Sequence, residues 1–294
     1  MDHSKFRGTG VALITPFKKD LSVDHVALEK LLDFNIENGI NYFVSLGTTG
    51  ESATLSAAEK IEVWNFTASI VKKRVPLVAG IGGNNTGEIS AQIESIDASL
   101  FDAILSVSPY YNKPSQEGIY RHYMQLAARS PLPIILYNVP GRTASNITAE
   151  TTLRLAAASQ KIIGIKEASG NLAQMMQIIK NKPKDFSVIS GDDLITLPGI
   201  SFGMDGVISV VAQAFPKDFS AMVSEALDGN FRPAQKLHYK LFPFMELFFE
   251  EGSPPGVKAA LNILGLCEET VRLPLTEVSR ALYEKIKAAI ANDY

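Results

Sequence analysis

Short apolar runs alternate with amphipathic segments along nearly the whole chain, and this alternation limits the possible folds more than any other feature. The runs are rich in β-branched residues, which is typical of parallel strands that are buried on both faces. Eight runs are predicted to be strands: Val11–Ile14, Tyr42–Ser45, Leu77–Ala79, Ala103–Val107, Ile134–Tyr137, Ile162–Lys166, Ser187–Ser190 and Gly206–Ser209.

The segments between the runs have apolar residues at helical spacing, and some of them also carry end signals. Ser56 and Glu59 have the spacing of a capping box, which predicts the start of a helix. The pair Asn38-Gly39 is typical of a helix end. Helices are therefore predicted at Val26–Asn38, Ser56–Val71, Gln116–Ala128, Thr148–Ala157, Asn171–Ile179 and Ala212–Leu227.

Strands that alternate with helices form either a closed eight-fold barrel or a doubly wound open sheet. A dinucleotide-binding open sheet would carry G-x-G-x-x-G after its first strand, and this chain does not. Polar candidate residues follow the ends of several strands, as at the mouth of a barrel. The prediction is an α/β protein with a (β/α)8 TIM barrel at residues 1–227, which carries the active site, and a C-terminal helical extension at residues 228–294. The extension is predicted to contain helices at Phe231–Glu250, Gly256–Leu264 and Leu275–Ala291.

Composition argues against several classes of protein. The formal net charge is −3 and no cluster of lysine and arginine is present, so a nucleic-acid partner is not expected. No apolar run approaches the roughly 20 residues of a membrane helix, and Met1–Gly10 lacks the apolar core of a signal peptide. Cys267 lies among apolar residues, where packing is the simpler role, and no metal-ligand spacing is found. We expect a cytoplasmic protein with no membrane partner, no metal and no cofactor.

Lys166 ends one of the apolar runs, and Tyr137 ends the run before it. In a barrel both side chains would point into the mouth. Burial favours the neutral amine of a lysine, which can attack a carbonyl group. A phenol on the neighbouring strand can carry protons to and from the resulting adduct. The alternative is a structural lysine that extends to the surface, beside an aromatic residue at the rim.

Two loops offer groups that bind carboxylates. In Gly47–Glu51, the hydroxyls of Thr48 and Thr49 and the backbone N–H groups can hold a carboxylate without a metal. A plain strand-to-helix turn is the alternative. After Tyr137, a loop with Pro and Gly carries Arg142, whose guanidinium suits a second carboxylate. The alternative is an ordinary surface arginine.

Tyr110 and Tyr111 lie between two prolines and form a rigid aromatic projection. Such a projection either reaches a partner subunit, lines the site, or packs within the chain.

Three motifs occur in an order that resembles a known family: Gly47–Glu51, Tyr137–Thr143 and Gly164–Glu167. They closely resemble the signatures of the dihydrodipicolinate synthase / N-acetylneuraminate lyase superfamily, and the resemblance covers nearly the whole chain.

The resemblance implies that Lys166 forms an imine with pyruvate. It implies that Tyr137, Thr48 and Tyr111 form a proton relay in which Tyr111 enters the site of a neighbouring subunit. It also implies a homotetramer assembled as a dimer of dimers.

Substrate-binding residues follow from the same resemblance. Thr48 and Thr49 would bind the pyruvate carboxylate, and Arg142 would bind the carboxylate of L-aspartate 4-semialdehyde. The backbone of Gly191 and Ile208 would line the pocket. The implied reaction condenses the two acids and uses neither a metal nor an organic cofactor.

Thr48 and Arg142 favour this reaction over others in the superfamily, because sialic acid lyases usually have Ser-Thr-Gly-Glu in the first loop and lack Gly-Arg-Thr. The alternatives are an N-acetylneuraminate lyase, a 2-keto-3-deoxy sugar acid aldolase, or a non-catalytic regulator that binds pyruvate. A regulator would be expected to lose the relay residues, which this chain keeps.

Members of the family are often inhibited by lysine at a dimer interface. Asn84, Glu88 and Tyr110 match polar and aromatic positions of that site. Ala57 and Lys60 stand where sensitive enzymes have histidines, and Lys60 would repel a cationic ligand. Lysine inhibition is therefore predicted to be weak or absent.

Overall fold

The structure is a computed structural model that describes residues 3–294. Its centre is a closed barrel of eight parallel strands that follow one another around the barrel in chain order. The strands are β1 (Gly8–Ala12), β2 (Tyr42–Ser45), β3 (Leu77–Gly80), β4 (Ala103–Val107), β5 (Ile134–Asn138), β6 (Ile162–Glu167), β7 (Ser187–Ser190) and β8 (Gly206–Ser209). The predicted α/β barrel is therefore confirmed.

Seven strands lie at the predicted positions or extend one residue beyond them, but the predicted first strand was misplaced. β1 begins at Gly8, and it closes the barrel through the pairs Gly8↔Gly206 and Gly10↔Ile208. Glycine has a low strand propensity, which hid this segment. At Gly10 a Cβ atom would lie 2.3 Å from the ring of Tyr42, so the barrel interior requires glycine there.

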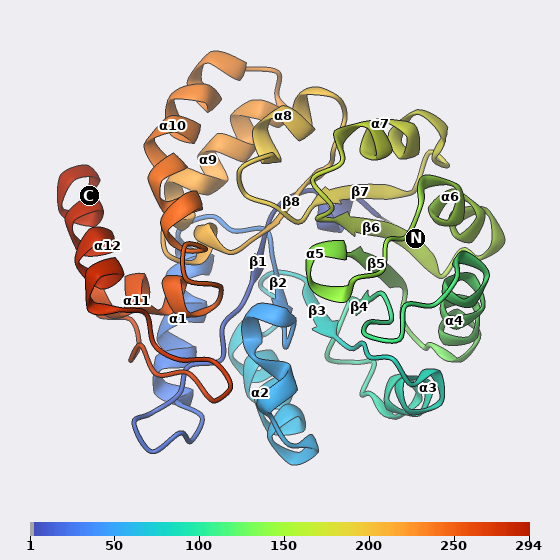
Figure 1. The fold of residues 1–294 in the computed structure, drawn as a ribbon, viewed down its shortest axis with the longest axis horizontal. Helices are drawn as coiled ribbons and strands as arrows, with labels where there is room; N and C mark the ends of the chain where they lie inside the picture. The colour runs from blue at the N-terminus through green and yellow to red at the C-terminus, as the bar shows by residue number, and fades with distance from the viewer. Residues whose placement is uncertain (1–2) are drawn as a thin grey trace.

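Helices surround the strands in a ring (Figure 1). They are α1 (His25–Glu37), α2 (Ala57–Val71), α3 (Thr86–Ser95), α4 (Gln116–Arg129), the single turn α5 (Pro140–Thr143), α6 (Ala149–Ala158), α7 (Leu172–Asn181), α8 (Thr196–Ser201) and α9 (Pro216–Leu227). Short 3₁₀ turns are η1 (His3–Phe6), η2 (Thr48–Gly50), η3 (Ser52–Thr54) and η4 (Val211–Gln213).

Two features of the helical layer differ from the prediction. The helices α3, α5 and α8 were not predicted, although Asn85 caps α3 and Ile89 and Ile93 form its buried face. The segment predicted as one helix from Ala212 is instead η4 followed by α9, which begins at Pro216. Proline has no backbone N–H and is accommodated in a first helical turn, so the break lies in front of it.

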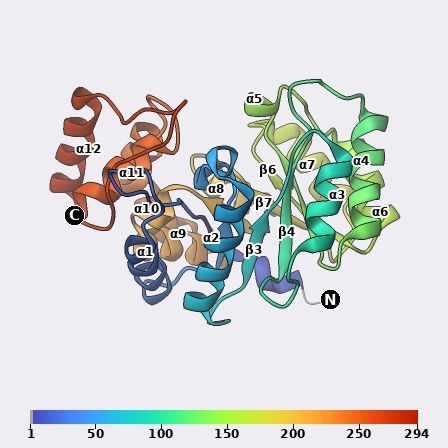
Figure 2. The same ribbon diagram turned by 90° about the horizontal axis from the view of Figure 1, so that it is seen from below.

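The C-terminal extension consists of α10 (Phe231–Leu247), α11 (Pro255–Ile263) and α12 (Arg280–Asp293). In both ribbon views these helices gather on one side of the barrel, next to α1 and α9 (Figures 1 and 2). Buried residues of all three helices belong to the same hydrophobic core as the outer faces of the strands. For example, the rings of Phe215 and Phe244 lie 4.3 Å apart, which joins the start of α9 to α10. The extension therefore packs as part of the barrel's core.

Candidate active site

Lys166 and Tyr137 lie side by side at the carboxyl ends of β6 and β5. They are partners in the strand register. The Lys166 Nζ atom lies 4.5 Å from the centroid of the Tyr137 ring. Both side chains are buried, with exposed fractions of 5% and 7%. The structure therefore brings together an enclosed amine and a phenol at the end of a barrel where active sites are found.

A cavity of about 450 Å³ opens above this pair. Its lining includes six of the residues that the sequence indicated: Thr48, Thr49, Tyr137, Arg142, Lys166 and Gly191. A second cavity of about 430 Å³ shares Thr48, Tyr137 and Arg142 with the first and extends to Lys60 and Tyr110. Residues from four different barrel loops thus converge on one space.

The threonine loop is held by contacts that the sequence did not indicate. Thr49 is buried, and Thr15 Oγ1 donates a hydrogen bond of 2.7 Å to the carbonyl of Gly50. Glu51 has a left-handed backbone (φ 51°), and its Oε1 atom lies 2.5 Å from Nζ of Lys258 in α11. Neither side chain of this ion pair is exposed. The extension therefore anchors the loop that carries Thr48 and Thr49.

The extension also supplies one wall of the mouth. Arg142 lies in α5, and its Nη2 atom donates a long hydrogen bond of 3.4 Å to the carbonyl of Ser253. Met245, Phe249 and Glu250, at and beyond the end of α10, line the same cavity as Lys166. Sequence reasoning missed these residues because no motif marks them.

Gly191 follows β7 and packs against the lysine. A Cβ atom built on it would lie 2.9 Å from Cε of Lys166 and 2.7 Å from Cβ of Ala168. Its N–H donates a hydrogen bond of 2.8 Å to the carbonyl of Glu167. The absence of a side chain at this position leaves room for the extended Lys166 side chain.

Two predicted residues do not line the cavity of their own chain. Ile208 is 1% exposed and packs inside the barrel. Tyr111 is 87% exposed, has a left-handed backbone (φ 72°), and donates its N–H to the carbonyl of Thr143 at 3.4 Å. A non-glycine residue in this conformation costs on the order of 1–3 kcal/mol. The Tyr111 side chain therefore does not line either cavity at the mouth of its own chain.

The three residues matched to a lysine site lie near one another at the surface. Asn84 and Glu88 are exposed, and Asn84 Nδ2 donates to the carbonyl of Tyr110 at 3.3 Å. Tyr110 is 41% exposed and lines the second cavity together with Lys60.

A buried carboxyl group next to the mouth was also missed. Asp193 is 3% exposed, and its Oδ2 atom accepts the N–H groups of Val210 and Val211 at 3.1 and 3.0 Å. Burial raises the pKa of Asp193 to about 6. The carboxyl therefore takes up a proton in the folded protein at a pH where it is ionised in the unfolded chain.

The pKa of Asp193 predicts a pH-dependent loss of stability. Because its pKa is higher in the folded state, stability falls as the pH rises from about 4 to about 6 and then levels off. Asp193→Asn keeps an oxygen for the two N–H groups and removes the charge. We expect the variant to be more stable than the parent above pH 6 by about 1–3 kcal/mol and equally stable near pH 4. Urea unfolding across this range measures the difference, and a pH-independent difference would contradict the assignment.

A metal-binding cluster and a membrane-spanning helix are both absent from residues 3–294. Among residues 3–294, no group of three or more histidine, cysteine, aspartate or glutamate side chains is placed to hold a metal ion. Within the same range, no helix has the length and apolar character needed to cross a bilayer. Burial raises the pKa of the Cys267 thiol to about 12, which disfavours the nucleophilic thiolate.

Comparison with known proteins gives a consistent result. The model of the dihydrodipicolinate synthetase family matches residues 5–293. A 4-hydroxy-tetrahydrodipicolinate synthase from Flavobacterium psychrophilum is 54% identical, with 96% of each chain covered. The enzyme of the same name from Parabacteroides distasonis is 50% identical, over 97% of this chain and 96% of its own. The crystal structure of dihydrodipicolinate synthase from Aquifex aeolicus superimposes with a TM-score of 0.95 at 39% identity and covers 98% of both chains.

Proposed function

The chain belongs to the dihydrodipicolinate synthetase family, and from this premise we propose that it condenses pyruvate with L-aspartate 4-semialdehyde to form 4-hydroxy-tetrahydrodipicolinate. The observation that carries the proposal is the buried Lys166 amine, which lies 4.5 Å from the Tyr137 ring in a cavity lined by Thr48, Thr49 and Arg142. One nucleophile, one phenol and two groups of carboxylate-binding side chains match the needs of a Schiff-base condensation of two acids.

The reaction begins at the amine. Lys166 Nζ adds to the keto carbon of pyruvate, and loss of water gives an iminium ion that withdraws electrons. The methyl group then loses a proton, and the enamine attacks the aldehyde carbon of the semialdehyde. Finally the amino group of the semialdehyde attacks the imine carbon, which releases Lys166 and closes the ring. Tyr137 carries the protons that these steps release and consume.

Binding roles follow from the lining of the cavity. Thr48 and Thr49 hold the carboxylate of pyruvate by hydrogen bonds. Arg142 holds the carboxylate of the semialdehyde with two parallel N–H groups. The backbone of Gly191 completes the pocket, and Ile208 packs in the barrel interior and supports it from there. The cavity of about 450 Å³ is in the usual range for small-molecule sites.

A homotetramer, built as a dimer of dimers, is part of this proposal. Tyr111 completes the proton relay from a neighbouring subunit; its 87% exposure and its absence from the lining of its own chain's cavity support this role. Asn84, Glu88 and Tyr110 form a lysine site at that contact, where Lys60 keeps inhibition weak.

Borohydride trapping tests the proposed chemistry. Reduction in the presence of pyruvate converts the imine to a stable amine, and peptide mass mapping locates it. We expect one adduct, on Lys166. Turnover with pyruvate and L-aspartate 4-semialdehyde, compared with pyruvate and N-acetylmannosamine, separates the synthase from a sialic acid lyase. No adduct at Lys166 would disprove the imine, and preference for the amino sugar would reassign the second substrate.

Arg142→Ala is expected to weaken binding of the second substrate alone. Loss of a charged hydrogen-bonding group costs about 1.5–3 kcal/mol. The KM for L-aspartate 4-semialdehyde should therefore rise about 10- to 100-fold while the KM for pyruvate stays within about threefold. Arg121→Ala is the control, because Arg121 is exposed and pairs with Glu117 on α4. Equal increases in both KM values would contradict the assignment.

Gly191→Ala is expected to displace the nucleophile. The new methyl group would lie 2.9 Å from Cε of Lys166, so the lysine side chain must move. A misplacement on the order of 1 Å lowers kcat by about 100-fold. Gly87→Ala is the control, because the nearest atom to its new Cβ is 3.5 Å away. Unchanged steady-state kinetics in Gly191→Ala would show that the lysine adapts without loss.

A further inference from the structure

A buried polar cluster lies on the outer side of the two strands that carry Lys166 and Tyr137. It consists of Asn138, Asn146, Glu167 and Gln174. Side chains alternate between the two faces of a strand, so Glu167 points away from the barrel interior where Lys166 points toward it. Asn138 and Tyr137 alternate in the same way. The cluster thus lies behind the catalytic pair, beneath α6 and α7.

Glu167 is the centre of the cluster and is fully buried. Its carboxylate accepts hydrogen bonds from Asn138 Nδ2 at 3.1 Å to both oxygens, from Gln174 Nε2 at 2.9 Å, and from the N–H of Ser169 at 2.9 Å. None of the ion pairs formed by residues 3–294 includes Glu167. A buried carboxylate held only by neutral donors is sensitive to the loss of any one of them.

The hydrogen bonds of Glu167 join β5 and β6 one residue further along the strands than Tyr137 and Lys166. In the register of β5 and β6, Tyr137 is the partner of Lys166, and Asn138 is the partner of Glu167. The Asn138–Glu167 bond therefore ties the two strand ends together next to the amine and the phenol. The bond from Ser169 folds the chain back directly after Ala168, which lines the cavity.

The remaining polar atoms of Asn138 also form hydrogen bonds within the cluster. Its Nδ2 atom also donates to Asn146 Oδ1 at 2.8 Å, and its Oδ1 atom accepts the N–H of Ile147 at 2.9 Å. Asn146 and Gln174 exchange hydrogen bonds of 2.9 and 3.3 Å. A fully satisfied network of this kind holds one arrangement of its members.

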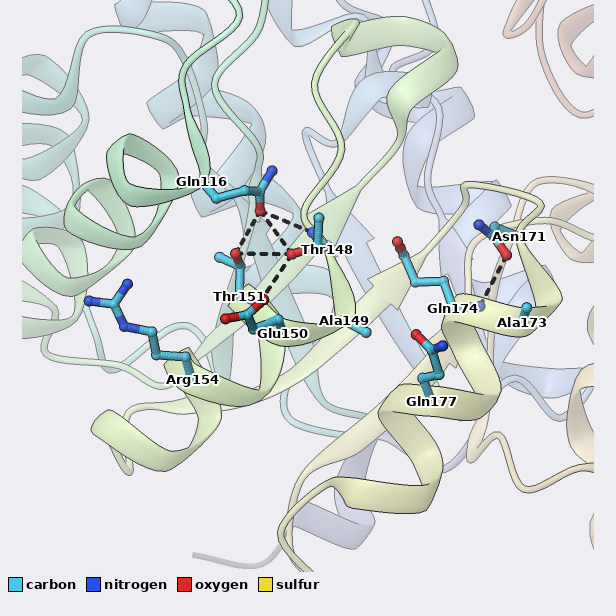
Figure 3. Close-up of a pocket in the computed structure, with 10 residues that line it drawn as sticks. All are labelled: Gln116, Thr148, Ala149, Glu150, Thr151, Arg154, Asn171, Ala173, Gln174 and Gln177. Carbon is cyan, nitrogen blue, oxygen red and sulfur yellow. Dashed lines mark hydrogen bonds between the residues drawn. The ribbon is translucent and has the colours of Figure 1, made fainter.

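The network continues outward to a polar groove between α6 and α7 (Figure 3). Gln116 Nε2 donates to the carbonyl of Asn146 at 2.7 Å, and Gln116 Oε1 accepts from Thr148 and Thr151. Gln174 reaches inward from α7 at the other side of the groove. The start of α6 and the first turns of α7 are thereby joined to the strand ends.

We propose that Glu167 and Asn138 are positioning residues that set the separation of Lys166 and Tyr137. Neither touches the substrate; they act through the register of β5 and β6. The inference rests on the proposed function, because it assigns the cluster a role in forming the Lys166 imine.

Exchanging the Glu167 carboxylate and the Asn138 amide between the two strands tests this role. Glu167→Gln keeps the size of the side chain but replaces one acceptor oxygen by an NH2 group that faces other donors, so it should separate the strand ends. We expect pyruvate trapping by borohydride and kcat to fall about 10- to 100-fold, the scale of a displacement on the order of 1 Å, with KM for pyruvate changed less than threefold. The double variant Asn138→Asp/Glu167→Gln restores one carboxylate and one amide across the strands. It should recover activity to within about threefold of the parent, after rotation of the Asn146 and Gln174 amides.

Controls separate positioning from loss of stability. Leu155→Ala creates a cavity beneath α6, where Leu155 is fully buried, without changing the cluster's hydrogen bonds. It should lower the melting temperature and leave trapping within twofold at a temperature where all variants are folded. Gln174→Leu removes one donor to Glu167 and should slow trapping about 3- to 10-fold, which keeps the test available where Glu167→Gln does not fold.

The inference would be overturned by trapping of Glu167→Gln at the parent rate, or by failure of the double variant to recover when it is folded. An equal slowing by Leu155→Ala would assign the effect to stability and would also overturn it. If the parent protein itself forms no adduct with pyruvate, the proposed function fails instead.

Discussion

Lys166→Met is expected to form no borohydride-stable adduct with pyruvate and to lose at least about 10⁴-fold in kcat. Methionine is close to lysine in length, so the packing against Gly191 and the Tyr137 ring is kept while the amine is removed. Without an amine no imine forms, and the methyl group of pyruvate has no electron sink. Steady-state kinetics and mass mapping after reduction measure both effects.

A matched control uses a lysine outside the site. Lys180, in the last turn of α7, is exposed and is not part of the cavity lining. Lys180→Met should form the adduct and turn over at the parent rate. An adduct on another lysine in the Lys166→Met protein would move the nucleophile elsewhere and contradict the mechanism.

Tyr137→Phe is expected to reduce kcat by about 10²- to 10⁴-fold, the range of a general acid–base contribution. The ring that contacts the Lys166 amine at 4.5 Å remains, and only the hydroxyl is lost. Because the amine is still present, the adduct with pyruvate should form, but more slowly. Stopped-flow and steady-state measurements distinguish slower imine formation from loss of binding.

The corresponding control removes a hydroxyl from a structural tyrosine. Tyr123 is fully buried, and its hydroxyl donates to the carbonyl of Ser106 at 2.9 Å. Tyr123→Phe should lower stability by about 1 kcal/mol, the net value of a hydrogen bond, and leave kcat unchanged. A kcat for Tyr137→Phe within twofold of the parent would show that another group carries the protons.

Local patterns were sufficient for most of the barrel. Runs such as Ala103–Val107 are buried on both faces, so their composition alone marks them as strands. The strand β1 was misplaced because glycine has a low strand propensity. Gly8 and Gly10 instead allow the close approach of neighbouring strands and of the Tyr42 ring, which the local sequence does not reveal. The break before α9 similarly depends on how η4 turns the chain.

The residues of the candidate site also fall into those that local patterns revealed and those that only the structure revealed. Lys166 and Tyr137 were found because each ends an apolar run, and parallel strands bring their carboxyl ends to one face. The Glu51–Lys258 pair, the contact of Arg142 with Ser253, and the Glu167 cluster were not found. Each joins segments whose closeness depends on the packing of the entire chain.

The sequence by itself determined the order of strands and helices, the family, and the polar groups placed at the strand ends, because all of these follow from short-range patterns. Only the tertiary structure decided that α10 lines the mouth and that α11 anchors the threonine loop. It also decided that Gly191 leaves space for the lysine and that a buried carboxylate joins the two catalytic strands. Such contacts depend on distances in space between groups far apart in the chain, and side-chain packing sets those distances only after the barrel has closed.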